Sequence, residues 1–264
     1  MLKGVLHVHS TYSDGERSLA QLRELFLSEG CRFVVMSDHA DSLDARRVRE
    51  YVDECRRRSD AEFVFVPGLE FSCERRMHVL GYGVTALCAS TDPQEVIRHI
   101  ERERGIAVIA HPQDSAFAWI ESFETLPAGI EVWNTKYDGQ YAPRARTFRL
   151  LHTLQARRRD MLAFYGQDHH WFKQFRELYT LVHIDRLDPQ AILDALRSGE
   201  FHAVKGAFEL PSDGKLDEIR MAEFDRTNAR SSGIRKFVQQ LNRVRKQLGL
   251  TIPAPIKAQL RRFF

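Results

Sequence analysis

Residues 4–9 read GVLHVH, and residues 166–170 read GQDHH. Each segment places two histidines at or just beyond the end of a short apolar run, and such runs are typical of buried strands. Comparable runs occur at residues 32–37, 62–66, 78–82, 105–110, 129–134, 161–165 and 180–184. The sequence therefore predicts seven or eight buried strands, several of which end in polar side chains.

Helices are predicted between these strands because capping signals mark their ends. Ser18 and Gln21 have the spacing of a capping box, and Gly30 is expected to end that helix. Asp92-Pro93 and Asp188-Pro189 each place a capping residue before a proline at the first helical position. Strands that alternate with helices predict parallel strands in a βα repeat, where eight would make a regular barrel and seven a distorted one.

The alternation of strands and helices stops near residue 205. Residues 206–215 read as a connection, and residues 232–248 carry apolar side chains at helical spacing. We therefore expect a barrel at residues 1–205, followed by a linker and a basic helical extension at residues 206–264. This extension is expected to contact nucleic acid, an anionic membrane surface or another subunit, or to dock on its own barrel.

Charge is distributed unevenly along the 264 residues. From residue 226 to 264 there are ten Lys or Arg and no Asp or Glu, so the preceding chain has 29 basic against 36 acidic residues, a net charge of −7. With 43% hydrophobic and 28% charged residues the composition is that of a globular protein. No window approaches the roughly 18 apolar residues of a spanning helix, and no signal-peptide core is evident, so a cytoplasmic location is expected.

Histidines and carboxylates recur where the predicted strands end. Because the carboxyl ends of parallel strands meet at one face, we expect these side chains to converge. A single histidine at a strand end is more often structural than a ligand, and only the joint recurrence indicates a metal site. Imidazole and carboxylate without thiolate suit zinc, manganese or iron. The nine candidate ligands are His7, His9, Asp14, His39, Glu70, His78, His111, Asp168 and His170.

Six short motifs contain eight of these residues: HVHS at 7–10, SDG at 13–15, SDH at 37–39, GLE at 68–70, AHP at 110–112 and GQDHH at 166–170. This series resembles the PHP (polymerase and histidinol phosphatase) family over about residues 1–205. The resemblance implies a distorted seven-stranded βα barrel, three divalent metal ions and phosphoesterase activity. Hydrolysis of a small phosphorylated metabolite or nucleotide by a metal-bound hydroxide is the implied reaction.

The resemblance also implies how the ligands divide among manganese, iron or zinc ions. The first ion is assigned His7, His9, Glu70 and Asp168; the second shares Glu70 and adds His78 and His111; the third is assigned Asp14, His39 and His170. Glu70, Asp168 and His170 are carried over as catalytic residues. Asp38 is expected to orient a ligand histidine through a hydrogen bond.

Substrate phosphate needs fixed cations, and arginine binds phosphate in a bidentate manner. Candidate substrate contacts, each with a surface or packing role as its alternative, are Arg75, Arg76, Lys136, Arg144 and His169. The loop at residues 134–139 is the favoured source, and Trp171 is interpreted as packing or as a wall of the site. The substrate stays open, and an oligonucleotide nuclease or a non-catalytic metal-binding scaffold remains an alternative.

Overall fold

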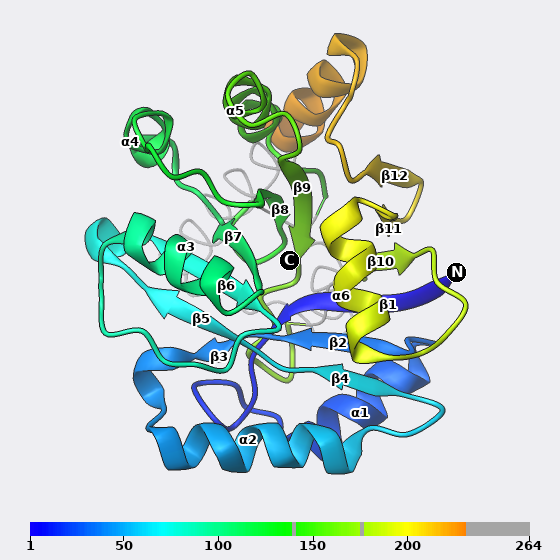
Figure 1. Ribbon diagram of the computed structural model, residues 1–264. Helices are drawn as coiled ribbons and strands as arrows, with labels where there is room; N and C mark the ends of the chain where they lie inside the picture. The colour runs from blue at the N-terminus through cyan, green and yellow to red at the C-terminus, as the bar shows by residue number, and fades with distance from the viewer. Residues whose placement is uncertain (139–140, 175–176, 231–264) are drawn as a thin grey trace, which may run out of the picture.

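The computed structural model describes residues 1–138, 141–174 and 177–230, which form an α/β structure with two six-stranded sheets (Figure 1). The first sheet has the order β12 (Phe208–Pro211), β11 (Phe201–Lys205), β10 (Tyr179–Val182), β1 (Leu2–Val8), β2 (Phe33–Met36) and β4 (Val64–Val66). The second has the order β3 (Asp38–His39), β5 (Gly68–Ser72), β6 (His78–Tyr82), β7 (Ile106–Ala110), β8 (Gly129–Asn134) and β9 (Leu162–Gly166).

The chain crosses twice from the first sheet to the second, because Ser37 alone separates β2 from β3 and Pro67 alone separates β4 from β5. On the other side, backbone bonds join β1 to the segment after β9. The His169 N–H donates to the His7 carbonyl at 3.1 Å, and the His9 N–H donates to the His169 carbonyl at 2.9 Å. The regular ladders nevertheless form two sheets, so a continuous seven-stranded barrel is not confirmed.

The strand directions differ from the parallel repeat that the sequence predicts. β1, β2 and β4 are parallel, as are β7, β8 and β9. In contrast, β6 is antiparallel to both β5 and β7, and β10 and β11 are also antiparallel to their neighbours. The parallel expectation is wrong for β6 because the short connection between β5 and β6 leaves no room for a crossover helix. It is also wrong for β10 and β11, which are antiparallel although α6 lies between them in the chain.

The helices begin where the capping signals predict. The described helices are α1 (Leu19–Ser28), α2 (Ala45–Arg58), α3 (Pro93–Arg102), α4 (Phe117–Glu121), α5 (Ala145–Gln155) and α6 (Pro189–Ser198). Ser18 and Gln21 form both bonds of the capping box, and the side chains of Asp92 and Asp188 cap α3 and α6. Three short 3-10 turns, η1 (Ala40–Ser42), η2 (Glu74–Arg76) and η3 (Asp114–Ala116), follow strands or connect them.

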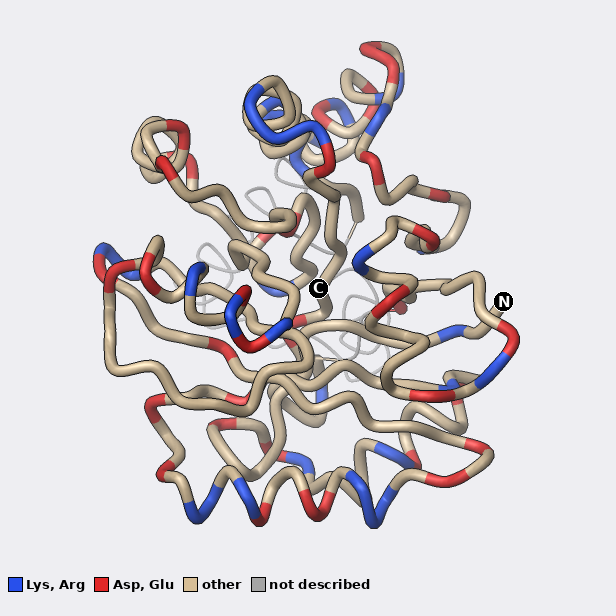
Figure 2. The backbone as a smooth tube through the Cα atoms, in the orientation of Figure 1, with Lys and Arg blue, Asp and Glu red and all other residues tan. Residues whose placement is uncertain are grey.

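The helices turn apolar faces inward and charged faces outward. In α2 the buried residues Val48, Tyr51 and Cys55 recur at helical spacing, and this helix packs on β4. Its Arg, Asp and Glu residues mark the outer edge of the molecule in Figure 2. The largest buried rings come both from strands, as with Trp133 in β8 and Phe164 in β9, and from the helices that cover them, as with Phe148 in α5, so the core lies between the sheets and these helices.

Part of the predicted extension belongs to the described fold. Residues 208–211 form β12 and extend the first sheet, while Leu210, Met221 and Phe224 are buried. The ring of Phe224 lies 6.0 Å from that of Phe148 in α5. Segment 206–215 is therefore more than a connection, and the division at residue 205 stays a prediction. The predicted helix at residues 232–248 and most of the basic extension lie outside the described residues.

None of the helices in the described part of the chain combines the length and the apolar character needed to cross a bilayer.

Candidate metal centre

All nine predicted ligands converge at one end of the strands. Their ligand atoms form four overlapping groups, within each of which they lie within 4.8 Å of one another. His7, His39, His111 and Asp168 come from the carboxyl ends of parallel strands or the segments that follow them. His78 reaches the same end because it begins the antiparallel strand β6, where it pairs with Ser72 and Ala110. The reversed strand is therefore what adds this histidine to the cluster.

Glu70 lies at the centre of the cluster. Its Oε2 is 3.4 Å from His7 Nε2, 3.2 Å from His9 Nε2 and 3.5 Å from His39 Nδ1. Its Oε1 is 2.8 Å from His78 Nδ1 and 3.3 Å from His111 Nε2. Burial alone would raise the pKa of Glu70, but the histidines, His7 foremost, hold this pKa well below its usual range. The carboxylate is therefore ionised and faces five imidazoles.

A second carboxylate, Asp168, lies beside Glu70. Its Oδ1 is 3.7 Å from the Nε2 atoms of both His7 and His9 and 3.0 Å from His170 Nδ1. Burial would raise the pKa of Asp168, but its histidine neighbours, His7 foremost, hold this pKa well below its usual range. Asp168 therefore also stays ionised in the buried end of the cluster.

The more open edge of the cluster contains His9, Asp14, His39 and His170. Asp14 Oδ1 is 3.2 Å from His170 Nε2, 3.6 Å from His9 Nδ1 and 3.8 Å from His39 Nε2. Asp14 is half exposed, whereas His9 and His170 are buried, and their rings stack with centroids 3.9 Å apart. This edge is where the cluster opens to solvent.

The donor chemistry of the cluster fits divalent metal ions. Neither ring nitrogen of the buried His9 makes a well-aligned hydrogen bond within the described residues, although Nε2 lies 3.2 Å from Glu70 Oε2 and buried nitrogens are normally satisfied. Burial lowers the pKa of His9 to about 3, so its ring is neutral and free to coordinate through nitrogen. Six imidazoles and three carboxylates match the ligands that zinc, manganese and iron accept.

Glu131 is a residue that the sequence analysis missed. Its Oε1 accepts a hydrogen bond from His7 Nδ1 at 2.8 Å, and its Oε2 accepts from the His111 N–H at 2.9 Å and from Asn134 Nδ2 at 3.0 Å. A carboxylate on one ring nitrogen leaves the other nitrogen directed at the metal side. The signal for this role was present, since Glu131 is the acidic residue inside the apolar run at residues 129–134.

Three of the predicted ligands have a left-handed backbone. The φ angles are 62° at His7, 28° at His111 and 51° at Asp168. Non-glycine residues avoid this region at a cost of order 1–3 kcal/mol each, and such strain concentrates at functional sites. At His7 the pairing of β1 with β2 also shifts register, so the regular alternation of a strand does not by itself place His7 beside His9.

Asp38 does not have the role that the sequence analysis gave it. Instead of bonding a histidine, it accepts hydrogen bonds from the backbone N–H groups and the hydroxyls of Ser10 and Ser13, at 2.6–3.1 Å. Serine, not imidazole, faces this carboxylate because the turn after β1 folds over the start of β3. Asp38 therefore fastens the loop that carries Asp14 to the cluster.

We expect Asp38→Ala to destabilise this loop, because the substitution leaves the hydroxyls of Ser10 and Ser13 and the buried N–H of Ser10 without this acceptor. A loss of about 2–4 kcal/mol in the free energy of unfolding follows from the cost of removing a charged acceptor. Urea denaturation measures this loss. Asp41→Ala, an exposed acid in the next turn, is the matched control. A stability of Asp38→Ala equal to that of this control would contradict the anchoring role.

The predicted substrate contacts divide into two groups. Lys136 lies in the cluster, with its Nζ 3.1 Å from Asp168 Oδ1 and 3.3 Å from His170 Nδ1. Arg144 is instead bonded to Asp114, the Pro112 carbonyl and Asp138.

The other three predicted substrate-binding residues have different surroundings. Arg75 lies over the Trp119 ring at 4.5 Å, and Arg76 is exposed next to it in η2. His169 is buried against Phe26, and burial lowers its pKa to about 4. Lys136 is thus the cation that the fold places among the candidate ligands.

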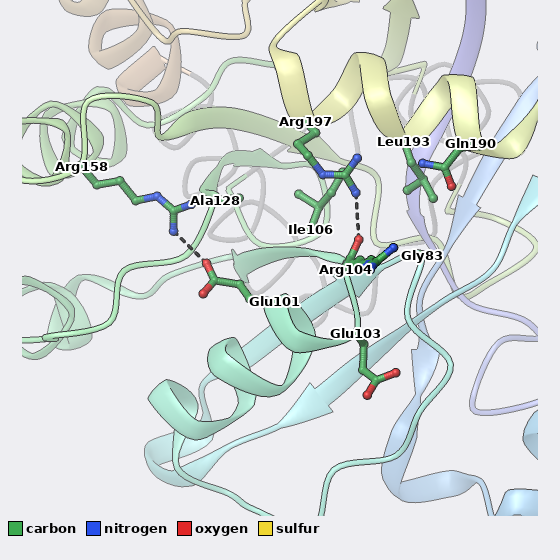
Figure 3. A pocket seen from close by; sticks show the side chains of 11 residues that line it. Gly83, Glu101, Glu103, Arg104, Ile106, Ala128, Arg158, Gln190, Leu193 and Arg197 are labelled. Carbon is green, nitrogen blue, oxygen red and sulfur yellow. Dashed lines mark hydrogen bonds and ion pairs between the residues drawn. The ribbon is translucent and has the colours of Figure 1, made fainter.

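A cavity of about 700 Å³ lies at the opposite ends of β7 and β8, lined by residues such as Gly83, Ile106 and Ala128 (Figure 3). Arg197 donates to the Arg104 carbonyl there, and Arg158 pairs with Glu101. The cavity shares no residue with the histidine cluster. The candidate site is therefore the cluster rather than this cavity.

Comparisons with known proteins show where this fold occurs. A scan against protein-family models and a search of curated proteins each found no match. A solved structure from Bacteroides vulgatus, a two-domain protein containing a predicted PHP-like metal-dependent phosphoesterase, superposes with a TM-score of 0.55 and 14% identity. The match covers 86% of this chain and 69% of that protein. The fold is PHP-like.

A second solved structure has a similar likeness. PsfC from Pseudomonas syringae superposes with a TM-score of 0.53 and 14% identity, over 78% of this chain and 92% of that protein. Across such a sequence distance the likeness concerns the fold alone. Within this PHP-like fold, the nine ligand candidates of the present chain lie together at one end of the strands.

Proposed function

We propose that this protein is a metal-dependent phosphoesterase that hydrolyses a phosphate ester of a small metabolite or nucleotide. The observation that carries the proposal is the convergence of six histidines and three carboxylates around Glu70, next to the ammonium group of Lys136. Divalent ions held by such ligands lower the pKa of water and neutralise charge on phosphoryl oxygens. The PHP-like fold supports the same class of reaction.

We further propose that the cluster holds three ions, in the division that the motifs imply. The first takes His7, His9, Glu70 and Asp168; the second takes Glu70, His78 and His111; the third takes Asp14, His39 and His170. One of the four groups in the structure, His7, His9 and Asp168, lies within the first set, and another contains the whole of the last set together with His9. A third group joins His7 of the first set to Glu70 and His111 of the second. The fourth group, His39, Glu70 and His78, crosses these sets, so metal stoichiometry is the measurement that decides the number of ions.

The residues themselves have separate tasks in this proposal. Glu70 and Asp168 act as anionic ligands rather than as bases, because their low pKa values make them poor proton acceptors near pH 7. Glu131 holds the ring of His7, and Asp38 holds the loop of Asp14. Lys136 supplies a positive charge that attracts a phosphoryl oxygen. The ring of His170, the third catalytic candidate, contacts the carboxylates of both Asp14 and Asp168.

The proposed activity is tested by phosphate release from phosphomonoesters, bisphosphates, cyclic phosphodiesters and short oligonucleotides. Metal-stripped protein is reconstituted separately with manganese, iron and zinc, and His9→Ala is run in parallel. Release from one small-molecule class that is lost in His9→Ala supports the proposal. Cleavage of oligonucleotides alone favours the nuclease alternative, whose support, the basic extension, lies mostly outside the described residues. Metal binding without release from any compound favours the non-catalytic scaffold.

We expect Lys136→Met to lower kcat/KM for the best phosphoester by about 10- to 100-fold, which corresponds to one charge-assisted hydrogen bond. Metal content should stay at the wild-type level, because Lys136 is not among the proposed ligands. The control is Lys215→Met, which removes an exposed lysine paired with Asp213. Equal kcat/KM in Lys136→Met and the control would remove Lys136 from substrate binding.

We also propose an interpretation of the two-sheet architecture. In the proposed arrangement seven strand paths follow one another around the cluster, which is supported by the backbone bonds between β1 and the segment after β9 and by the two crossings between the sheets. We infer that this arrangement is a distorted barrel whose ladders are interrupted at Ser37 and Pro67.

A further inference from the structure

Large aromatic side chains are exposed at the mouth of the histidine cluster. Tyr137 is 50% exposed and Trp171 is 46% exposed. Exposed aromatic surface is unfavourable in water unless a ligand or partner covers it, and a patch beside a polar site is typical of ligand binding. These two rings therefore raise the question of what they contact in the functioning protein.

Both rings lie directly beside proposed ligands. The Tyr137 ring centroid is 4.4 Å from that of His111, with the planes inclined by 38°. The Trp171 ring centroid is 5.6 Å from that of His170, with the planes inclined by 39°. The two rings thus border the cluster from two different loops, one after β8 and the other after β9.

Lys136 lies close both to these two rings and to the proposed metal ligands. Its Nζ is 5.3 Å from the Tyr137 ring and 5.2 Å from the Trp171 ring, while it also contacts Asp168. A phosphate that binds at Lys136 has its alcohol portion next to exposed aromatic faces. A planar ring in that alcohol can stack there, and stacking of a base on an aromatic side chain contributes about 1–3 kcal/mol. An alcohol without a ring gains less from the same surface.

We propose that Trp171 and Tyr137 are specificity-determining residues that select phosphate esters whose alcohol carries a planar aromatic ring, such as a nucleoside. This inference rests on the proposed phosphoesterase function. Phosphate binds at Lys136, and the ring of the alcohol stacks on Trp171, with Tyr137 as the second contact. The stacking surface is present before substrate binds, so the selection needs no rearrangement of the two loops.

Two matched pairs of compounds test this selection. Adenosine 5′-monophosphate and ribose 5-phosphate share the sugar phosphate and differ by the base, and phenyl phosphate and glycerol phosphate likewise differ by a ring. Dissociation constants are measured by calorimetry on the full chain without metal, and phosphate release is measured on the metal-loaded protein. We expect the ring-bearing member of at least one pair to bind about 5- to 150-fold more tightly, the range that corresponds to 1–3 kcal/mol.

The variants show whether the two rings cause the preference. Trp171→Leu is expected to bring the ratio of dissociation constants within a pair close to one, and Tyr137→Leu is expected to reduce it. Phe172→Leu removes a neighbouring ring that is 48% exposed and contacts Arg17, and this control should keep the wild-type ratio. Equal binding within both pairs, or a ratio unchanged in both ring variants, overturns the inference. A ring preference without phosphate release from any compound instead overturns the proposed function and leaves the inference standing.

Discussion

Glu70→Gln is expected to lose metal binding and phosphoesterase activity together. Glu70 is the one carboxylate within 3.5 Å of five histidine rings in the described structure, and the substitution keeps its size while removing its charge. Removing one member of a buried ionic set costs about 3–5 kcal/mol, and a loss of this size in metal binding corresponds to about a 10²- to 10⁴-fold lower affinity. Activity should fall by at least this factor, because two of the three proposed ions share this carboxylate.

Three measurements check this expectation: metal content after dialysis, the rise in Tm on adding manganese or zinc, and phosphate release. The wild type should gain stability as metal is added, since a ligand that binds only the folded state stabilises it. Glu70→Gln should gain little at the same concentrations. Glu24→Gln, an exposed substitution on α1, is the control. Wild-type metal content in Glu70→Gln would show that the carboxylate is not a ligand.

Gly166→Ala is expected to disrupt the site although Gly166 is not itself a proposed ligand. A Cβ at residue 166 would collide with Glu131 Oε1 and would lie only 2.9 Å from the Cβ of His7. Glu131 therefore cannot keep its bond to His7, and the ring that it orients must move. Loss of such an orienting contact typically lowers metal affinity or activity by about 10- to 100-fold, and the displacement of His7 itself places the expected effect at the upper end of this range.

Gly81→Ala separates this effect from simple crowding in a strand. Its Cβ would approach side chains of Ile100 and Phe71 at 3.1 Å, far from Glu131, so it should lower Tm while leaving metal content intact. Gly166→Ala should lower metal content after dialysis, and Glu131→Gln should do so by a similar factor. Full metal occupancy in Gly166→Ala would show that the contact between Glu131 and His7 is dispensable.

The identity of the ligand candidates could be predicted because their signal lies in local sequence. An apolar run that ends in His or Asp shows both that a strand is buried and that its end is polar, so the positions of His7, His39, His111 and Asp168 follow from pattern alone. The signals for helix capping also lie in local sequence. The side chains of Ser18, Asp92 and Asp188 accept capping hydrogen bonds, which confirms the predicted helix starts.

What could not be predicted depends on tertiary contacts. The direction of β6 is set by a short connection and by pairing on both sides, and the βα pattern contains no sign of it. The left-handed backbone at His7, His111 and Asp168 costs free energy locally. Local backbone preferences therefore predict a negative φ at these residues. Asp38 was given the wrong partner because sequence shows that an acid lies near the site but not which donors it faces.

The meeting of β1 with the segment after β9 has a consequence during protein synthesis. His7 and His9 leave the ribosome before Asp168 and His170, which follow after about 160 further residues, and the backbone bonds at His169 require both segments. A nascent chain that stops short of residue 168 lacks Asp168 and His170, so it cannot hold ions as the finished protein does. With the proposed ligand division, we therefore expect metal to bind late in translation or after release, when the ions available to the completed chain determine which metal it receives.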